Sequence, residues 1–138
     1  MKTIIVSRPK ENFNKYCSYK ILVRDQVLSD LKNGEEKMIE LPPDFENEEL
    51  SAKIQWCGSK KLNLKNITDN EKVTVKGNVF LNRKLSLLGA IFPLLGLIIF
   101  KLNIFPKNIG IAIFVVMILA VIGTLTIGKN KWLTLTTE

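Results

Sequence analysis

Residues 109–128 read IGIAIFVVMILAVIGTLTIG and contain no charged side chain. Only Thr124 and Thr126 are polar in this stretch. An α-helix rises about 1.5 Å per residue and the hydrocarbon core of a bilayer is about 30 Å thick, so about 20 apolar residues span it. The stretch therefore predicts a transmembrane helix over residues 109–128.

A second apolar stretch, LSLLGAIFPLLGLIIF, occupies residues 85–100. Lys101 follows it and can extend its alkyl chain toward water. Together with its flanks, this stretch predicts a first transmembrane helix over residues 83–105, and Pro-Lys-Asn at 106–108 predicts a short loop. The alternative is two helices buried in a soluble protein, and it is disfavoured because the preceding residues are too few to cover both. A two-helix membrane hairpin is the simpler interpretation.

Basic residues concentrate at the outer ends of this predicted hairpin. Five flank its ends and two lie near its loop: Lys76, Arg83, Lys84, Lys129 and Lys131, against Lys101 and Lys107. The positive-inside rule therefore predicts an integral membrane protein with both termini in the cytoplasm. We expect no secretory signal, because the first residues hold only a three-residue apolar run.

The same basic residues are candidates for contact with lipid headgroups. Anionic headgroups attract each nearby basic residue by about 1 kcal/mol, and an aromatic ring beside such residues favours the interface. The candidate residues are Lys76, Arg83, Lys84, Lys129, Lys131 and Trp132. Lys60, Lys61, Lys65 and Lys72 add positive charge before them, and a plain solvated face remains an equal alternative. Nucleic acid is disfavoured as a partner because aromatic residues do not interleave with the lysines.

Residues 1–82 show the two-residue alternation of β-strands. Residues 50–57 alternate most regularly, with Leu50, Ala52, Ile54 and Trp56 on one face. The predicted strands cover residues 2–7, 16–24, 26–31, 37–41, 50–57, 62–67 and 73–81. Turn residues such as Asn33-Gly34 separate them. The pattern predicts an all-β sandwich of about seven short antiparallel strands over residues 1–82, and residues 129–138 are expected to form a short cytoplasmic tail.

Four segments of this half resemble a known family. They read YKILVRD at 19–25, LKNGE at 31–35, IELPP at 39–43 and LSAKIQWCGS at 50–59. They resemble PEGA-type small β-sandwich domains, and the whole chain resembles uncharacterised small bacterial membrane proteins that join such a domain to a hydrophobic tail. Two turns depart from the family pattern, since Gln26 follows Asp25 and residues 44–46 replace a glycine-containing turn. The resemblance implies a fold and no activity.

The residues that commonly carry catalysis or bind metals are few. The chain has two cysteines and no histidine, too few ligands for a structural zinc site. Cys57 lacks an imidazole base, so it is interpreted as a structural residue at a strand end. Trp56 is interpreted as an anchor in the hydrophobic core, and Asn33 and Gly34 as a structural turn. The acidic run at 44–49 lacks the spacing of a calcium-binding loop. We expect no catalytic residue, no metal and no cofactor, and therefore no enzyme.

These expectations define the function hypotheses. The first is a membrane-anchored, non-catalytic interaction module whose sheet edge or loops hold a partner at the inner membrane face. The alternative is an accessory subunit whose hairpin packs into a larger membrane transport or channel complex. Membrane lipids and an unidentified protein are the expected partners.

Overall fold

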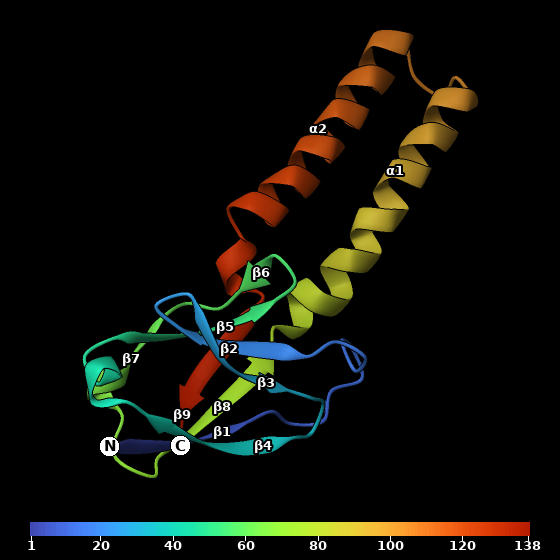
Figure 1. Ribbon diagram of the computed structural model, residues 1–138. Helices are drawn as coiled ribbons and strands as arrows, with labels where there is room; N and C mark the ends of the chain where they lie inside the picture. Colours follow the sequence, from blue (N-terminus) through green and yellow to red (C-terminus); the bar gives the residue numbers. More distant parts are fainter. The chain divides into compact units, whose positions relative to one another are not determined.

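The computed structural model describes residues 1–138, apart from the side chains of Leu85, Ser86 and Leu88. Two units make up the chain (Figure 1). The β domain comprises Met1–Asn78 and Lys129–Glu138, and the helical hairpin comprises Val79–Gly128. The hairpin is therefore inserted into the β domain, and the sequence-based boundary at residue 82 shifts to Asn78.

The β domain contains nine strands in two sheets. Their bounds are β1 (Lys2–Ser7), β2 (Tyr19–Val23), β3 (Gln26–Leu31), β4 (Glu36–Leu41), β5 (Glu49–Ile54), β6 (Cys57–Gly58), β7 (Leu62–Asn63), β8 (Lys72–Gly77) and β9 (Leu133–Thr137). Short 3₁₀ turns lie at Pro43–Phe45, Leu64–Asn66 and Lys129–Lys131. The predicted strands at 2–7 and 26–31 are confirmed to the residue.

The first sheet has the order β4-β1-β8-β9. Strand β1 pairs antiparallel with β4 and parallel with β8, where Val6 lies opposite Val73. The sequence pattern predicted antiparallel strands only, so this parallel pair corrects the prediction. Parallel neighbours need a long crossover connection, and here it comprises the strands β2 to β7, which include the whole second sheet.

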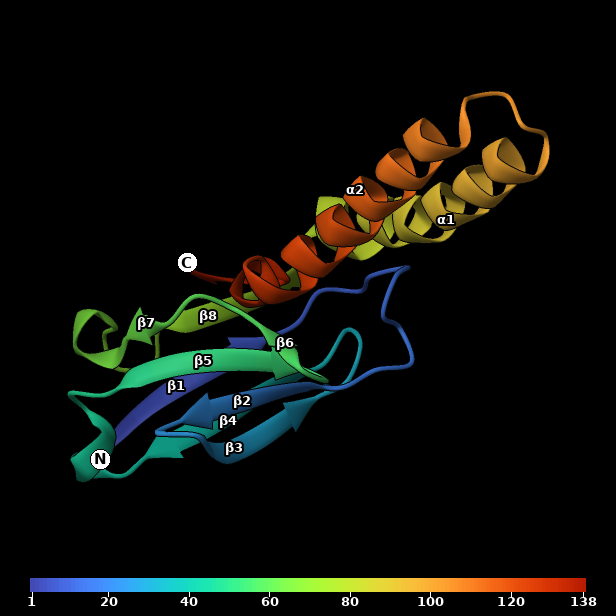
Figure 2. The same cartoon turned by 90° about the horizontal axis from the view of Figure 1, so that it is seen from above.

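The second sheet has the order β3-β2-β5-β6, with β7 also paired to β5, and Figure 2 shows β2 beside β5. The tight turn between β2 and β3 places Arg24 at φ 49° and Asp25 at φ 63°. Positive φ at both central residues matches the right-handed twist of the flanking strands. The predicted Asn33-Gly34 turn also forms, with Gly34 at φ 76°. The turn at Arg24-Asp25 therefore pairs Val23 with Gln26, and the turn at Asn33-Gly34 joins β3 to β4 of the first sheet.

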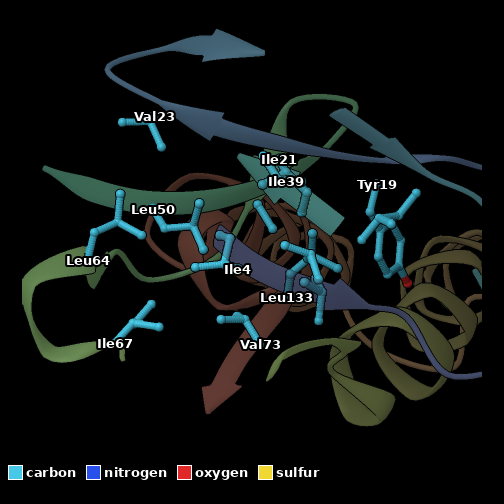
Figure 3. Packing of buried hydrophobic residues seen from close by; sticks show 14 of the residues in the cluster. Ile4, Tyr19, Ile21, Val23, Ile39, Leu50, Leu64, Ile67, Val73 and Leu133 are labelled. Carbon is cyan, nitrogen blue, oxygen red and sulfur yellow. The ribbon is translucent and has the colours of Figure 1, made fainter. Parts of the chain in front are cut away.

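Buried side chains from both sheets form one hydrophobic cluster (Figure 3). Ile4 and Val73 come from the first sheet, and Ile21 and Leu50 from the second. The predicted alternation is confirmed through β5, where Leu50, Ala52 and Ile54 are buried.

Trp56 was expected in this core, yet its residue is 65% exposed. Gln55, at φ 49°, and Trp56 form the turn between β5 and β6. The buried face of β5 ends at Ile54 because the turn interrupts the strand alternation there. Trp56 therefore does not continue that face, and its ring lies on the surface.

The predicted tail at residues 129–138 is instead part of the first sheet. Strand β9 pairs antiparallel with β8, and Figure 1 shows the two strands side by side. Leu133 is buried in the core, at 2% exposure. The Leu-Thr alternation of β9 suits a strand, but its partner is non-local because the hairpin separates them. The predicted continuation of the preceding strand to residue 81 is also wrong, because β8 ends at Gly77.

The hairpin begins with a π-helical turn at Phe80–Leu85 and continues as α1 (Ser86–Lys101) and α2 (Lys107–Thr126). Two helical segments, Phe80–Lys101 and Lys107–Thr126, are long and apolar enough to cross a membrane. The helices run side by side in both Figure 1 and Figure 2. A Cβ atom on Gly96 would lie 2.9 Å from Phe114 Cδ2, so this glycine permits close packing of the pair.

Candidate functional site

The pairing of β8 with β9 brings the two ends of the hairpin together. Gly77 lies opposite Leu133, and the Asn78 amide donates a hydrogen bond of 2.8 Å to the Trp132 carbonyl oxygen. Asn78 is the last residue before the hairpin, and Lys129 is the first residue after it. The chain therefore leaves and rejoins the β domain at a single place.

Ser59 brings two lysines to the same place. This buried serine forms an isolated parallel bridge with Leu133. Its Oγ accepts a hydrogen bond of 2.9 Å from the Ala52 amide and donates one of 2.8 Å to the Lys60 carbonyl oxygen. The backbone of Lys60 and Lys61 is thereby held beside the start of β9.

A cavity of about 330 Å³ lies between these segments. We call it the basic pocket, and its lining residues are Lys60, Lys61, Leu62, Asn78, Asn130, Lys131, Leu133, Thr134 and Leu135. Three lysines and two asparagines contribute polar groups, and no carboxylate belongs to this described lining. Its size lies at the lower end of the range of about 300–1,000 Å³ for small-ligand sites.

The charges of the basic pocket are only partly compensated. Lys61 Nζ lies 3.0 Å from Glu49 Oε2, and this hydrogen-bonded pairing raises the pKa of Lys61. Both side chains are more than half exposed, and exposed pairs contribute little free energy. Among the described side chains, no carboxylate lies within ion-pairing distance of Lys60 or Lys131. The pocket is therefore positively charged and open to an anion.

A second hollow of about 230 Å³ shares Lys61 and Asn130 with the basic pocket. Lys129 and the exposed Trp56 also line it. Trp56 thus lies near the residue at which the chain rejoins the β domain. Exposed tryptophan beside lysine is typical of membrane interfaces.

The predicted headgroup residues divide between the two units. In the β domain, Lys129 and Lys131 line the two hollows, while Lys76 is exposed on β8 and lines neither of them. Trp132 is half-buried and packs against the core. Arg83 and Lys84 are exposed in the hairpin unit.

The residues interpreted as structural lie outside the basic pocket. Cys57 is buried, and burial raises the pKa of its thiol, which makes it a poor nucleophile at neutral pH. Asn33 joins the loop before β2: its Oδ1 accepts from the Glu11 amide at 2.8 Å and its Nδ2 donates to the Glu11 carbonyl oxygen at 3.0 Å. Cys17 and Cys57 are both free thiols.

Sequence reasoning missed a buried polar cluster. The Arg8 side chain is fully buried, and its guanidinium stacks 3.6 Å from the centroid of the Tyr19 ring. Arg8 Nη2 lies 3.6 Å from Glu11 Oε2, and this carboxylate accepts hydrogen bonds from the Tyr19 hydroxyl at 2.5 Å and the Gly77 amide at 2.6 Å. Burial and the hydrogen bond to Glu11 raise the pKa of Tyr19.

This cluster holds the segment before β2 against the end of β8. The Arg8 guanidinium also donates to the Cys17 carbonyl oxygen at 2.6 Å and to the Leu31 carbonyl oxygen at 3.2 Å. Its charges are paired and enclosed, so its arrangement serves the fold. No local pattern marked it in the sequence, because Arg8 and Glu11 read as ordinary surface charges.

Comparisons with protein-family models, with curated proteins and with solved structures give no match. The resemblance to PEGA-type domains therefore stays a prediction.

Proposed function

We propose that the protein is a membrane-anchored, non-catalytic interaction module, with a hairpin that crosses the bilayer twice. The observation that carries this proposal is the pairing of β8 with β9 on either side of the hairpin. Strands of one sheet lie on the same side of a membrane, so the chain between them crosses an even number of times. Two helical segments of sufficient length match two crossings.

The proposed orientation places the β domain, and with it both termini, in the cytoplasm. Lys129 and Lys131 follow the second helix, and Arg83 and Lys84 precede the first α-helical turn. An excess of basic residues marks the cytoplasmic side of short membrane-flanking segments. The free cysteines agree with a reducing compartment.

We further propose that the two sheets form a small β-sandwich whose edge holds a protein partner. The shared hydrophobic cluster supports this interpretation. Strand β9 ends the first sheet and carries no charged side chain from Leu133 to Thr137. Edge strands commonly carry charges that block pairing with other chains, so an uncharged edge favours the addition of a partner strand.

Alkaline extraction followed by pull-down tests this proposal. The full chain should stay in the membrane pellet at high pH, and a tagged full chain should retain a partner that is still bound when the hairpin is replaced by a short linker. Release of the full chain into the supernatant would contradict anchoring. Loss of every partner together with the hairpin would contradict a binding β domain.

A second function is favoured by the surface of the hairpin. Added Cβ atoms on Gly89, Gly110 and Gly123 would meet nothing within 4 Å, so these small residues remain open to close approach by another helix. An apolar hollow of about 250 Å³ also lies between α1 and α2, lined by Gly96, Leu97, Phe100, Ile111 and Phe114. These features suit an accessory subunit of a larger membrane complex. Exchange for an unrelated two-span hairpin would abolish complex formation in that case and preserve it for the interaction module.

A further inference from the structure

We propose that the basic pocket binds the phosphate-ester group of an anionic phospholipid. This inference rests on the proposed function, because it requires the hairpin to lie in a membrane. It goes further by assigning a specific site and a ligand chemistry to residues of the β domain.

The position of the pocket along the chain supports a lipid ligand. Asn78 directly precedes the hairpin, and Asn130 and Lys131 follow its end by only two and three residues. Residues this close to two membrane-spanning helices lie at the depth of the headgroups. The ligand that reaches such a pocket most readily is the headgroup layer itself.

The chemistry of the lining matches a phosphate ester. The lysine ammonium group is a compact positive charge that commonly binds phosphate, and the side-chain amide of Asn130 can donate hydrogen bonds to phosphate oxygens. The apolar side chains of Leu62 and Leu135 also border the pocket, which suits a ligand that has a hydrocarbon part beside its charged group. A carboxylate in the lining would repel such a ligand, and the described lining has none.

The backbone around the pocket is fixed before any ligand arrives. The Ser59 bridge to Leu133 holds the segment of Lys60 and Lys61, and the hydrogen bond from the Asn78 amide to the Trp132 carbonyl oxygen holds the backbone at Asn78. Only the lysine side chains must be ordered on binding, which lowers the entropic cost of forming the complex. This preorganisation distinguishes the site from the scattered lysines elsewhere on the domain.

An acidic extended peptide is the rival ligand, since the pocket also borders the β9 edge. The position of the pocket decides against it. Its asparagines and Lys131 adjoin the hairpin, whereas a peptide pairing along β9 would extend toward Thr137, beyond the lined residues. The test below includes an acidic peptide, and tighter binding of that peptide would contradict the lipid proposal.

The test uses the full chain in detergent micelles and measures lipid adducts by native mass spectrometry. Short-chain phosphatidylglycerol should bind, and short-chain phosphatidylcholine should bind at least tenfold more weakly. Glycerol phosphate and inorganic phosphate distinguish a soluble phosphate from a lipid source, and a hexaglutamate peptide represents the rival. Equal binding of the two lipids, or tighter binding of a soluble phosphate or of the peptide, would overturn the proposal.

Variants then locate the site. Each lysine removed should weaken phosphatidylglycerol binding about fivefold, since a basic residue contributes about 1 kcal/mol near anionic headgroups. The triple variant K60Q/K61Q/K131Q should therefore lose affinity on the order of a hundredfold, and the single variant Lys131→Gln about fivefold. All three side chains are exposed, so folding should persist, and circular dichroism checks it.

A matched control removes the same charge elsewhere. The variant K15Q/K32Q/K65Q changes three exposed lysines that line neither hollow, and it should bind phosphatidylglycerol within about twofold of the parent protein. Equal losses in the two triple variants would show a net-charge effect and overturn the specific site. Alkaline extraction of the same variants distinguishes the proposed membrane anchoring from the proposed lipid site. A protein that stays in the membrane pellet but shows no preference for phosphatidylglycerol would contradict only the lipid site in the basic pocket.

Discussion

Apolar side chains are buried in the β domain and exposed on the hairpin. Ile4 and Val73 are fully buried in the β domain, whereas Leu94 and Val116 are 60% and 65% exposed on the hairpin. The strands of the first unit place apolar residues on one face, which two sheets can cover. The helices of the second unit are apolar on all sides, which two helices cannot cover for each other. This difference is expected if the hairpin lies in a membrane, as proposed, while the β domain folds in water.

The β domain is made of two segments of the chain that the hairpin separates. Strand β9 pairs with β8 after the hairpin, so the β domain is complete only when both segments of its sequence are present. The hairpin is thus an insertion between paired strands and differs from a tail that could be removed at one point. The following predictions test this division, starting with the largest effect.

Removal of β9 should unfold the β domain. Residues 1–82 alone lack the buried Leu133 side chain and the strand that covers β8, which together are worth about 5 kcal/mol, comparable to the whole stability of a small domain. A variant that joins Asn78 to Lys129 through about four Gly and Ser residues should fold. Circular dichroism and urea unfolding compare the two. A stably folded fragment of residues 1–82 would contradict a structural role for β9.

Loss of Glu11 should be the most damaging single change in the β domain. Glu11→Ala leaves the Arg8 guanidinium buried beside Tyr19 without its carboxylate, which costs about 3–5 kcal/mol. Urea unfolding of the linked β domain measures the loss. Glu36→Ala is the matched control, since its pair with Lys72 is partly exposed and should contribute less than about 1 kcal/mol. Equal effects of the two substitutions would contradict a stabilising role for the buried cluster.

The two units should also respond differently to an added methyl group. A Cβ atom at Gly77 would lie 2.5 Å from Phe13 Cε2 and 2.8 Å from the Tyr19 hydroxyl oxygen. Gly77→Ala should therefore destabilise the full chain by about 1–3 kcal/mol. Gly89→Ala meets open space and should leave stability unchanged within about 1 kcal/mol. Thermal unfolding in detergent compares them, and tolerance of Gly77→Ala would mean that the packing beside Glu11 is looser than described.

The smallest expected effect concerns the two thiols. Cys57 is buried with a raised pKa, and Cys17 is only partly buried. Maleimide should modify Cys57 roughly tenfold more slowly than Cys17 at neutral pH, because the raised pKa of Cys57 leaves little reactive thiolate and its side chain is more buried. The Cys57 rate should rise with pH and reach half its maximum above the ordinary pKa of 9.0. Single-cysteine variants measure each rate, and a faster Cys57 would revive it as a candidate nucleophile.

Much of the fold could be predicted because its signals are local. Hydrophobic length identified both apolar helices, and strand alternation placed the buried residues of β5. Errors arose where a turn or a distant partner decides the outcome: Trp56 lies in a two-residue turn, and β9 finds its partner across the hairpin. Pairings of this kind carry no signal in the local alternation.

The candidate site was predictable only in its charges. Lys129 and Lys131 were singled out from their position after the second helix. Their meeting with Lys60 and Lys61 depends on the bridge between Leu133 in β9 and Ser59, which directly follows β6 of the second sheet. The buried cluster of Arg8 and Glu11 was missed for the same reason, because burial of a charge follows from tertiary packing.

Cysteine accessibility in intact cells tests the central claim most directly. In a background without Cys17 and Cys57, single cysteines replace Lys107 at the start of α2 beside the interhelical loop, Lys32 in the β domain and Glu138 after β9. A membrane-impermeant maleimide should label only the Lys107→Cys site from outside, and the other two sites should react only after the membrane is opened. Labelling of all three sites from the same side in intact cells would contradict a hairpin that crosses the membrane twice.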